Sequence, residues 1–216
     1  MKKIKSVAAL LVAVMVLLLA GCAPKFDASG YVKGELDAAL KGEITDEYLK
    51  LVDATREEVE ANNQEMLDEV MVQFTSVGLS DELVAKYREY MSGLLKKCKY
   101  TVGEATKTDN GYTVPVTVEP LLFGDAMQEA LTSIEGDLMT WATETATSGE
   151  TPSEAEIMEQ TFTMLYDALN GSLETIGYGE ATEHTLNVVK GEDGKYTVAD
   201  EEVMALGESM IDPGSL

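Results

Sequence analysis

The pattern of the sequence changes at residues 98–119, which read CKYTVGEATKTDNGYTVPVTVE. From Cys98 to Thr106 and from Tyr112 to Glu119, apolar and polar residues alternate with the two-residue period of a half-buried strand. Between these segments, Thr108-Asp109-Asn110-Gly111 supplies residues that tolerate a positive φ, so we expect a β-hairpin. Pro115 has no N–H to donate, which predicts that its strand lies at an edge or at a bulge.

A second hairpin is expected near the end of the chain, from Ala181 to Lys190 and from Lys195 to Ala199, with its turn at residues 191–194. Both hairpins contain a glycine followed closely by Tyr-Thr-Val, at residues 111–114 and 194–198. Duplication of a unit of helices and a hairpin would explain the similarity, and so would hairpin chemistry used twice. We expect the two hairpins to join into one antiparallel sheet.

Helical periods fill the rest of the chain after residue 26. Shorter helices are expected over residues 27–41, 45–53, 55–78 and from Ser80 to the first strand, and a last one over 200–211 before residues 213–215, which should fray. Two long helices carry apolar stripes at residues 127–141 and 158–176, and the connection at 145–153 should make them an antiparallel helical hairpin. The sequence therefore predicts an α+β fold in which helices pack on an antiparallel sheet, as one domain over residues 27–212.

The first 22 residues are typical of a lipoprotein signal. Three lysines precede an apolar run from Val7 to Ala20, which leads into Leu19-Ala20-Gly21-Cys22. Spanning ~30 Å of hydrocarbon takes about 20 apolar residues, so this run is too short for a comfortable permanent span. We expect cleavage between Gly21 and Cys22, lipidation of Cys22, and a tether over residues 22–26 at the outer face of the cell membrane. The alternatives are an ordinary cleaved signal with a chance cysteine, and an uncleaved membrane anchor.

Several segments resemble a family of small lipoproteins. These are the signal ending in Cys22, the YVKGELDAALKG helix at residues 31–42, the KYTV strand at 99–102 and the DGKYTV strand at 193–198. Together they are similar to the domain-of-unknown-function lipoproteins of Gram-positive gut clostridia. The resemblance implies an NTF2-like or cystatin-like α+β fold and carries over no catalytic residue.

Charge limits the classes of partner. The mature chain from Cys22 onward carries 13 Lys and Arg against 39 Asp and Glu, a net charge of −26. Binding to nucleic acid or to anionic lipid relies on basic residues that neutralise phosphates, so we expect neither partner beyond the lipid anchor itself. A cationic small molecule or protein would be favoured electrostatically.

The residues with reactive side chains form no recognisable catalytic or cofactor motif. His184 is the only histidine, which excludes multi-histidine metal sites and leaves one candidate general base in an alternating segment. Cys98 is expected to be a small buried hydrophobe, because it lies at the start of a strand-like run and the only histidine, which could activate a thiol, lies far along the chain. The nine methionines of the mature chain fall mostly on apolar stripes and are expected to fill the core. The residues indicate no cofactor and no metal.

The favoured interpretation is a non-enzymatic binding or interaction module, held at the membrane by its lipid. If it has a ligand, we expect a cleft between the sheet and the two long helices, lined by Tyr100, Tyr112, Trp141, Phe162 and Tyr166. The alternative is a cell-envelope enzyme that uses His184 or a carboxylate pair. A third hypothesis, the substrate-capturing subunit of an importer, would need two α/β lobes and a longer chain.

Overall fold

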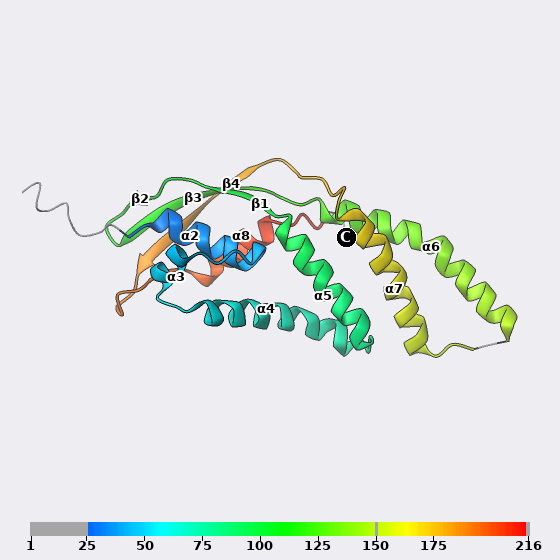
Figure 1. Cartoon of the computed structure of the whole chain (residues 1–216). Helices are drawn as coiled ribbons and strands as arrows, with labels where there is room; N and C mark the ends of the chain where they lie inside the picture. Colours follow the sequence, from blue (N-terminus) through cyan, green and yellow to red (C-terminus); the bar gives the residue numbers. More distant parts are fainter. Residues whose placement is uncertain (1–25, 150, 215–216) are drawn as a thin grey trace, which may run out of the picture.

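The computed structural model describes residues 26–149 and 151–214. Its antiparallel sheet consists of β1 (Lys99–Val102), β2 (Thr106–Lys107), β3 (Gly111–Glu119), β4 (Thr182–Lys190) and β5 (Tyr196–Val198). The order across the sheet is β1-β3-β4-β5, and β2 also pairs with β3. Figure 1 labels β1 to β4 of this sheet. Because β3 pairs with β4, the two predicted hairpins form one sheet, and the predicted α+β class is confirmed.

Pro115 lies in the middle of the sheet, not at its edge, and a bulge explains how it is tolerated. Residues 103–105 stand opposite only two residues of β3, since the register changes between Val102↔Val116 and Thr106↔Thr113. The N–H of Gly103 donates to the carbonyl of Pro115 (2.8 Å). In an antiparallel ladder the N–H and C=O of a residue face the same neighbour, so the missing donor of Pro115 faces the bulge and leaves the pairing with β4 intact.

Glycine is required at position 111 because β4 approaches the backbone closely there. The sequence predicted a different reason, a positive φ in the turn. It is not among the residues with positive φ. Instead, a Cβ at this position would lie 2.0 Å from the carbonyl oxygen of Val188 in β4. The turn of the second hairpin does need a positive φ, which Gly194 supplies at +85°.

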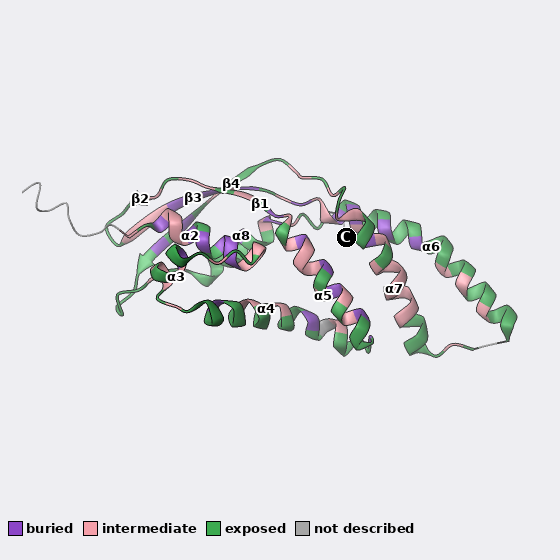
Figure 2. Ribbon diagram, viewed as in Figure 1, coloured by how far each residue is buried: buried purple, intermediate pink, exposed green. Residues whose placement is uncertain are grey.

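Helices cover one face of the sheet. They are α2 (Ala28–Leu36), the π-helix η1 (Asp37–Lys41) that continues it, and α8 (Asp200–Ser209). Their buried residues, among them Val32 and Leu206, pack in one cluster with the side chains of β3 and β4 that point to this face. The opposite face of β4 is exposed at Glu183, Thr185 and Asn187, so the sheet is covered on one side there (Figure 2).

Side chains cap the N-terminal ends of several helices. The side chain of Asp27 accepts a hydrogen bond from the backbone of Gly30 at the start of α2, and Thr45 caps α3 (Asp46–Val52) in the same way. Thr55 and Glu58 form a reciprocal capping box at the start of α4 (Arg56–Ser76). Satisfying these N–H groups fixes where each helix begins.

The helices α4 and α5 (Asp81–Lys96) form a second, smaller core with α7 (Glu154–Ser172). Its buried members are Met71, Leu79, Leu83 and Tyr87. The apolar side of α4 faces a core only in part, because Met66 and Val70 on that side are 53% and 41% exposed. Figure 2 shows α4 as mostly exposed, since it packs on few neighbours.

The two long helices, α6 (Phe123–Ser148) and α7, pair as the predicted antiparallel hairpin. Their far ends reach away from the sheet and the other helices (Figure 1). We call this pair the arm. None of the helices over the described residues, the arm included, is both long and apolar enough to cross a membrane.

The end of the chain is tied to the base of the arm, so the expectation that it frays is wrong for Pro213 and Gly214. The N–H of Leu121 donates to the carbonyl of Met210, and the N–H of Gly124 donates to the carbonyl of Asp212, both at 2.9 Å. A Cβ on Gly124 would lie 2.2 Å from the carbonyl oxygen of Pro213, so only glycine allows this approach.

Candidate ligand-binding groove

An open apolar groove runs between the two helical elements that cover the sheet. One wall is α2 with η1, the other is α8, and the groove has a volume of about 570 Å³. Leu36 and Leu40 line the groove from the first wall, and Leu186 and Val198 line it from the sheet. A volume of this size lies within the range of about 300–1,000 Å³ that is usual for small-molecule sites.

Three large apolar side chains of this groove are exposed to solvent. Met66 of α4 is 53% exposed, and Val203 and Met204 of α8 are 47% and 66% exposed. Exposed methionines are flexible and polarisable, and they adapt to ligands of different shapes. These side chains are therefore available to a molecule that enters the groove.

The polar groups of the groove are acidic or neutral. Glu35 and Asp200 supply carboxylates, and no lysine or arginine occurs among the described residues that line it. Tyr48 Oη donates a hydrogen bond to Glu35 (2.5 Å), which holds this carboxylate in place. Burial, and to a lesser extent the charge of Glu35, raises the pKa of Tyr31 to about 12, so this phenol stays protonated. The groove therefore favours a cation or a hydrogen-bond donor over an anion.

A buried carboxylate lies behind the η1 wall. Asp37 is 5% exposed and accepts hydrogen bonds from Lys33 and from Tyr100 Oη (2.5 Å), while Lys41 Nζ lies 3.6 Å away. Burial acts to raise the pKa of this carboxyl, but the hydrogen bonds and charges of these partners outweigh it and hold the pKa below its ordinary value. Because Ala39 and Leu40 of the same short helix line the groove, this network fixes the position of one wall.

The five aromatic residues that the sequence suggested for a cleft lie in separate places. Tyr100 donates to Asp37 at the side of η1, as described above. Tyr112 packs near the rings of Phe26 and Tyr196, with centroids 6.2 and 5.9 Å away. Trp141 lies far out on the arm, in a hollow between α6 and α7.

Only Phe162 and Tyr166 come together, and they do so in the second core. Their ring centroids lie 5.9 and 5.7 Å from that of Tyr87, both in edge-on arrangements. The arm points away from the sheet instead of lying across it, so the five rings do not converge on one cleft (Figure 1). None of the five lines the groove.

His184 lies half-buried on β4, on the same face as Leu186 and Val188. Its Nε2 is 3.2 Å from Thr182 Oγ1. No carboxylate lies within hydrogen-bond distance of its ring in the part of the chain that the structure describes. A hydroxyl is therefore near this ring, but the orienting acid of a catalytic triad is not.

Cys98 is 3% exposed, and burial raises the pKa of its thiol to about 11, which confirms the expected small buried side chain. Over residues 26–149 and 151–214, no group of three or more histidine, cysteine or acidic side chains could hold a metal ion. The predicted cleavage and lipidation site at Gly21 and Cys22 lies outside the described residues.

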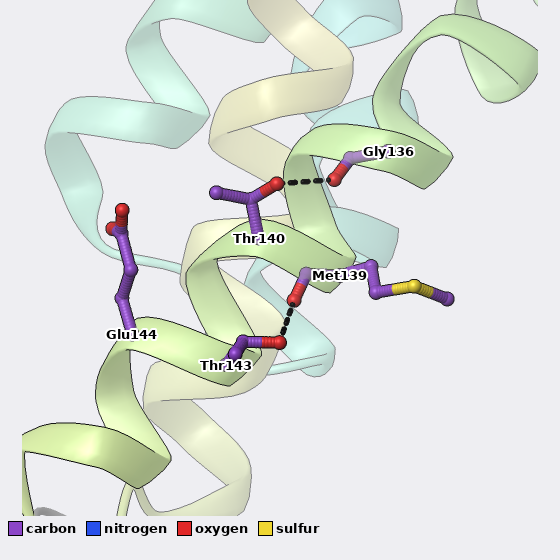
Figure 3. Close-up of a pocket in the computed structure, with 5 residues that line it drawn as sticks. All are labelled: Gly136, Met139, Thr140, Thr143 and Glu144. Carbon is purple, nitrogen blue, oxygen red and sulfur yellow. Dashed lines mark hydrogen bonds between the residues drawn. The ribbon is translucent and has the colours of Figure 1, made fainter.

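A shallow depression also marks the exposed side of α6. It is formed by Gly136, Met139, Thr140, Thr143 and Glu144. Figure 3 shows Thr140 Oγ1 donating to the carbonyl of Gly136 (2.9 Å) and Thr143 Oγ1 donating to that of Met139 (2.8 Å). Since both hydroxyls donate within their own helix, this surface offers few free polar donors.

Comparison with known proteins supports the fold. No family model matches the chain, and no curated protein does so either. A crystal structure from Bacillus subtilis subsp. subtilis str. 168, named as a "putative lipoprotein (ycdA)", has a similar fold, with a TM-score of 0.60 at 14% identity. The match covers 86% of this chain and 56% of that one, and at this identity it shows the fold alone. The resemblance to clostridial lipoproteins and to NTF2-like folds stays a prediction.

The sequence does not predict the groove, because methionines on apolar stripes are expected to fill the core. Four of the nine mature methionines are exposed, and two of these, Met66 and Met204, line the groove. Met204 lies in a short acidic helix, where a large apolar residue has little core to fill. This mismatch is the signal that could have pointed to the groove.

Proposed function

We propose that this protein is a lipid-anchored extracytoplasmic binding protein, and that the groove between α2–η1 and α8 holds its ligand. The ligand class that fits is an elongated apolar molecule with a cationic or hydrogen-bond-donating end. The observation that carries this proposal is an open groove of about 570 Å³ with apolar walls and acidic groups but no basic ones among the described residues that line it. Residues 27–212 would form the single domain that displays it.

The anchor is supported by the sequence of the first 22 residues and by the lipoprotein description of the structurally similar protein from Bacillus subtilis. The short tether between Cys22 and the domain would keep the groove within a few nanometres of the headgroups. The groove would then lie close to a source of amphiphilic molecules.

The anchor has a direct test. In the native type of cell, Cys22→Ala is expected to abolish incorporation of an alkyne-labelled fatty acid and to change the intact mass accordingly. Cys98→Ala is the matched control and should label like the wild type, because Cys98 is buried in the folded domain. A wild-type protein that keeps Met1, or that has an unmodified thiol at position 22, would contradict the proposal.

Blocking the groove should abolish binding of an apolar chain. Gly207 lines the groove on α8, and a Cβ there meets no atom within 4 Å, so Gly207→Leu introduces bulk without a backbone clash. We expect the affinity for a C12 amphiphile below its micelle concentration to fall about tenfold or more, which is about 1.4 kcal/mol. The mature chain with Cys22→Ser is suitable for calorimetric titration, since no acyl chain then competes.

Gly171→Leu provides the matched control, because Gly171 is also an open helical position and lies outside the groove. Equal affinities of wild type, Gly207→Leu and Gly171→Leu would rule the groove out as the binding site.

The head group should be selected by charge. We expect dodecyltrimethylammonium to bind more tightly than dodecyl maltoside, and dodecyl sulfate to bind least. Glu35→Gln together with Asp200→Asn should reduce this preference, because both substitutions remove a negative charge from the groove. The new amide at position 35 keeps an oxygen that can still accept the hydrogen bond from Tyr48 Oη, so the wall should stay in place. An undiminished preference in this double variant would show that the charge selection arises elsewhere on the acidic surface.

A further inference from the structure

The far half of the arm packs on nothing but itself. We call residues 135–149 and 151–158 the distal arm, and none of these described residues is buried. We call the rest of the protein, outside α6 and α7, the body. The outermost hydrogen bonds between the arm and the body run from the N–H of Ser80 to Glu159 and from Tyr87 Oη to the carbonyl of Phe162 (2.7 Å). Beyond them, α6 and α7 have only each other, so both outer faces lack a partner (Figure 1).

Apolar side chains are exposed on this unsupported part. Met139 is 69% exposed and Ile157 and Met158 are 42% and 39% exposed. A hollow of about 470 Å³ lies between the two helices, lined chiefly by Leu138, Trp141, Ala146, Pro152 and Ile157. Trp141 is the only tryptophan of the chain. Tryptophan in a hollow is a frequent anchor of protein interfaces.

Four threonine hydroxyls of α6 in the distal arm already donate hydrogen bonds within their own helix. Thr140, Thr143, Thr145 and Thr147 each donate to the carbonyl four residues earlier, at 2.7–2.9 Å. The first two of these bonds are visible in Figure 3. The surface therefore presents methyl groups and carboxylates, which is suited to an amphipathic partner.

The charge of the arm has one sign. No lysine or arginine occurs between Lys107 and Lys190, whereas residues 123–172 contain ten Asp and Glu. On the distal arm, Asp137, Glu144 and Glu154 form no ion pair with any residue that the structure describes. The body, by contrast, carries all the basic residues of the described chain.

We propose that the distal arm is the docking surface for a basic amphipathic helix of a partner protein. The helix would lie along α6 and α7 as a third member of a bundle, with apolar residues over Trp141 and Lys or Arg beside the carboxylates. A second copy of this chain fits poorly, because two arms of like charge would repel each other. Nucleic acid and anionic lipid are disfavoured for the same reason.

The single tryptophan reports directly on this surface. The mature chain with Cys22→Ser is titrated with an 18-residue helical peptide of leucine and lysine, and with its leucine–glutamate counterpart, at 0.05 M and 0.5 M salt. We expect the lysine peptide alone to shift the emission of Trp141 to shorter wavelength, with binding at least tenfold weaker at the higher salt.

Charge reversal separates docking from general attraction to an acidic protein. Asp137→Lys with Glu144→Lys should weaken peptide binding at least tenfold. Glu65→Lys with Glu69→Lys, two exposed positions in the middle of α4, should weaken it less than threefold. Circular dichroism and the melting temperature are the controls that test whether each variant is folded.

Several outcomes would overturn the proposal. They are an equal loss of affinity in both double variants, an emission that does not change, and equal binding of the glutamate peptide. A shift produced by zwitterionic vesicles but not by the lysine peptide would assign the arm to lipid, and a stable dimer that excludes the peptide would assign it to a second copy. Because Gly207→Leu blocks only the groove, it should leave peptide docking unchanged, which keeps this proposal separate from that of ligand binding.

Discussion

Gly111→Ala is expected to destabilise the protein by about 3 kcal/mol or more, the range reached when a buried site cannot relax. The added Cβ would lie 2.0 Å from the carbonyl oxygen of Val188 and 3.0 Å from its carbonyl carbon. Both atoms belong to the backbone of β4, which is held between β3 and β5, so neither strand can move without breaking pairs. Relieving this clash therefore requires loss of pairing at the end of the β3–β4 ladder.

The measurement is the urea midpoint followed by circular dichroism, together with the soluble yield. Gly171→Ala is the control, since a Cβ at that position of α7 meets no atom within 4 Å. It should stabilise the protein by about 0.5–1 kcal/mol, because alanine has the higher helix propensity. A Gly111→Ala protein with the wild-type midpoint would show that β3 and β4 do not approach this closely.

The features that the sequence predicted correctly are those fixed by local chemistry. The expected helix start at Thr55 is confirmed by its cap on α4, and the turn at Gly194 needs a conformation that glycine adopts freely. Alternation in residues 98–119 and 181–199 was enough to place both hairpins. Each of these signals depends on neighbours within a few residues, so no knowledge of the tertiary structure was needed.

The features that the sequence left open or mispredicted depend on what lies across the fold. The missing N–H of Pro115 indicated an edge or a bulge, and only the strand order shows that its strand is central and that the bulge is opposite. Periodicity showed that Met66 lies on the apolar side of α4, but not that this side borders an open groove. The direction of the arm decided where Trp141 lies, and no local pattern specifies that direction.

The candidate site was less predictable than the fold for the same reason. Its walls come from α2–η1 and α8, which are separated by most of the chain, and neither carries a recognisable ligand-binding motif. The acidic residues at the groove could not be told apart from the many others in so acidic a sequence. What distinguishes Glu35 is its hydrogen bond from Tyr48, which is a tertiary contact.

Asp37→Ala is expected to destabilise the protein by about 3 kcal/mol, as removal of one member of a buried charged network usually does. The change leaves Tyr100 Oη without its acceptor and Lys33 and Lys41 without their shared counter-charge. Tyr100→Phe removes one hydrogen bond to a charged group and should cost less, about 1.5–3 kcal/mol. Urea unfolding at pH 7 is the measurement that checks both values.

The pH dependence of stability tests whether the charge of Asp37 causes this stabilisation. The pKa of Asp37 is held below its ordinary value of 3.8 in the folded chain, so its ionised form stabilises the fold. This contribution is fully present above the unfolded pKa and is lost as the pH falls through the lower folded pKa. In Asp37→Asn, which keeps the shape and an acceptor for Tyr100, the stability deficit should therefore be largest at pH 5–7 and should shrink steadily below about pH 4.

The matched control is Asp46→Asn, an exposed carboxylate that pairs with Arg56 at 3.3 Å, because its side chain is 79% exposed and screened by solvent. Its deficit should stay small at every pH. If the deficit of Asp37→Asn were constant from pH 7 to pH 3, the charge of Asp37 would not stabilise the fold. The wall that carries Ala39 and Leu40 would then be held by packing alone, and groove binding should survive Asp37→Asn unchanged at low pH.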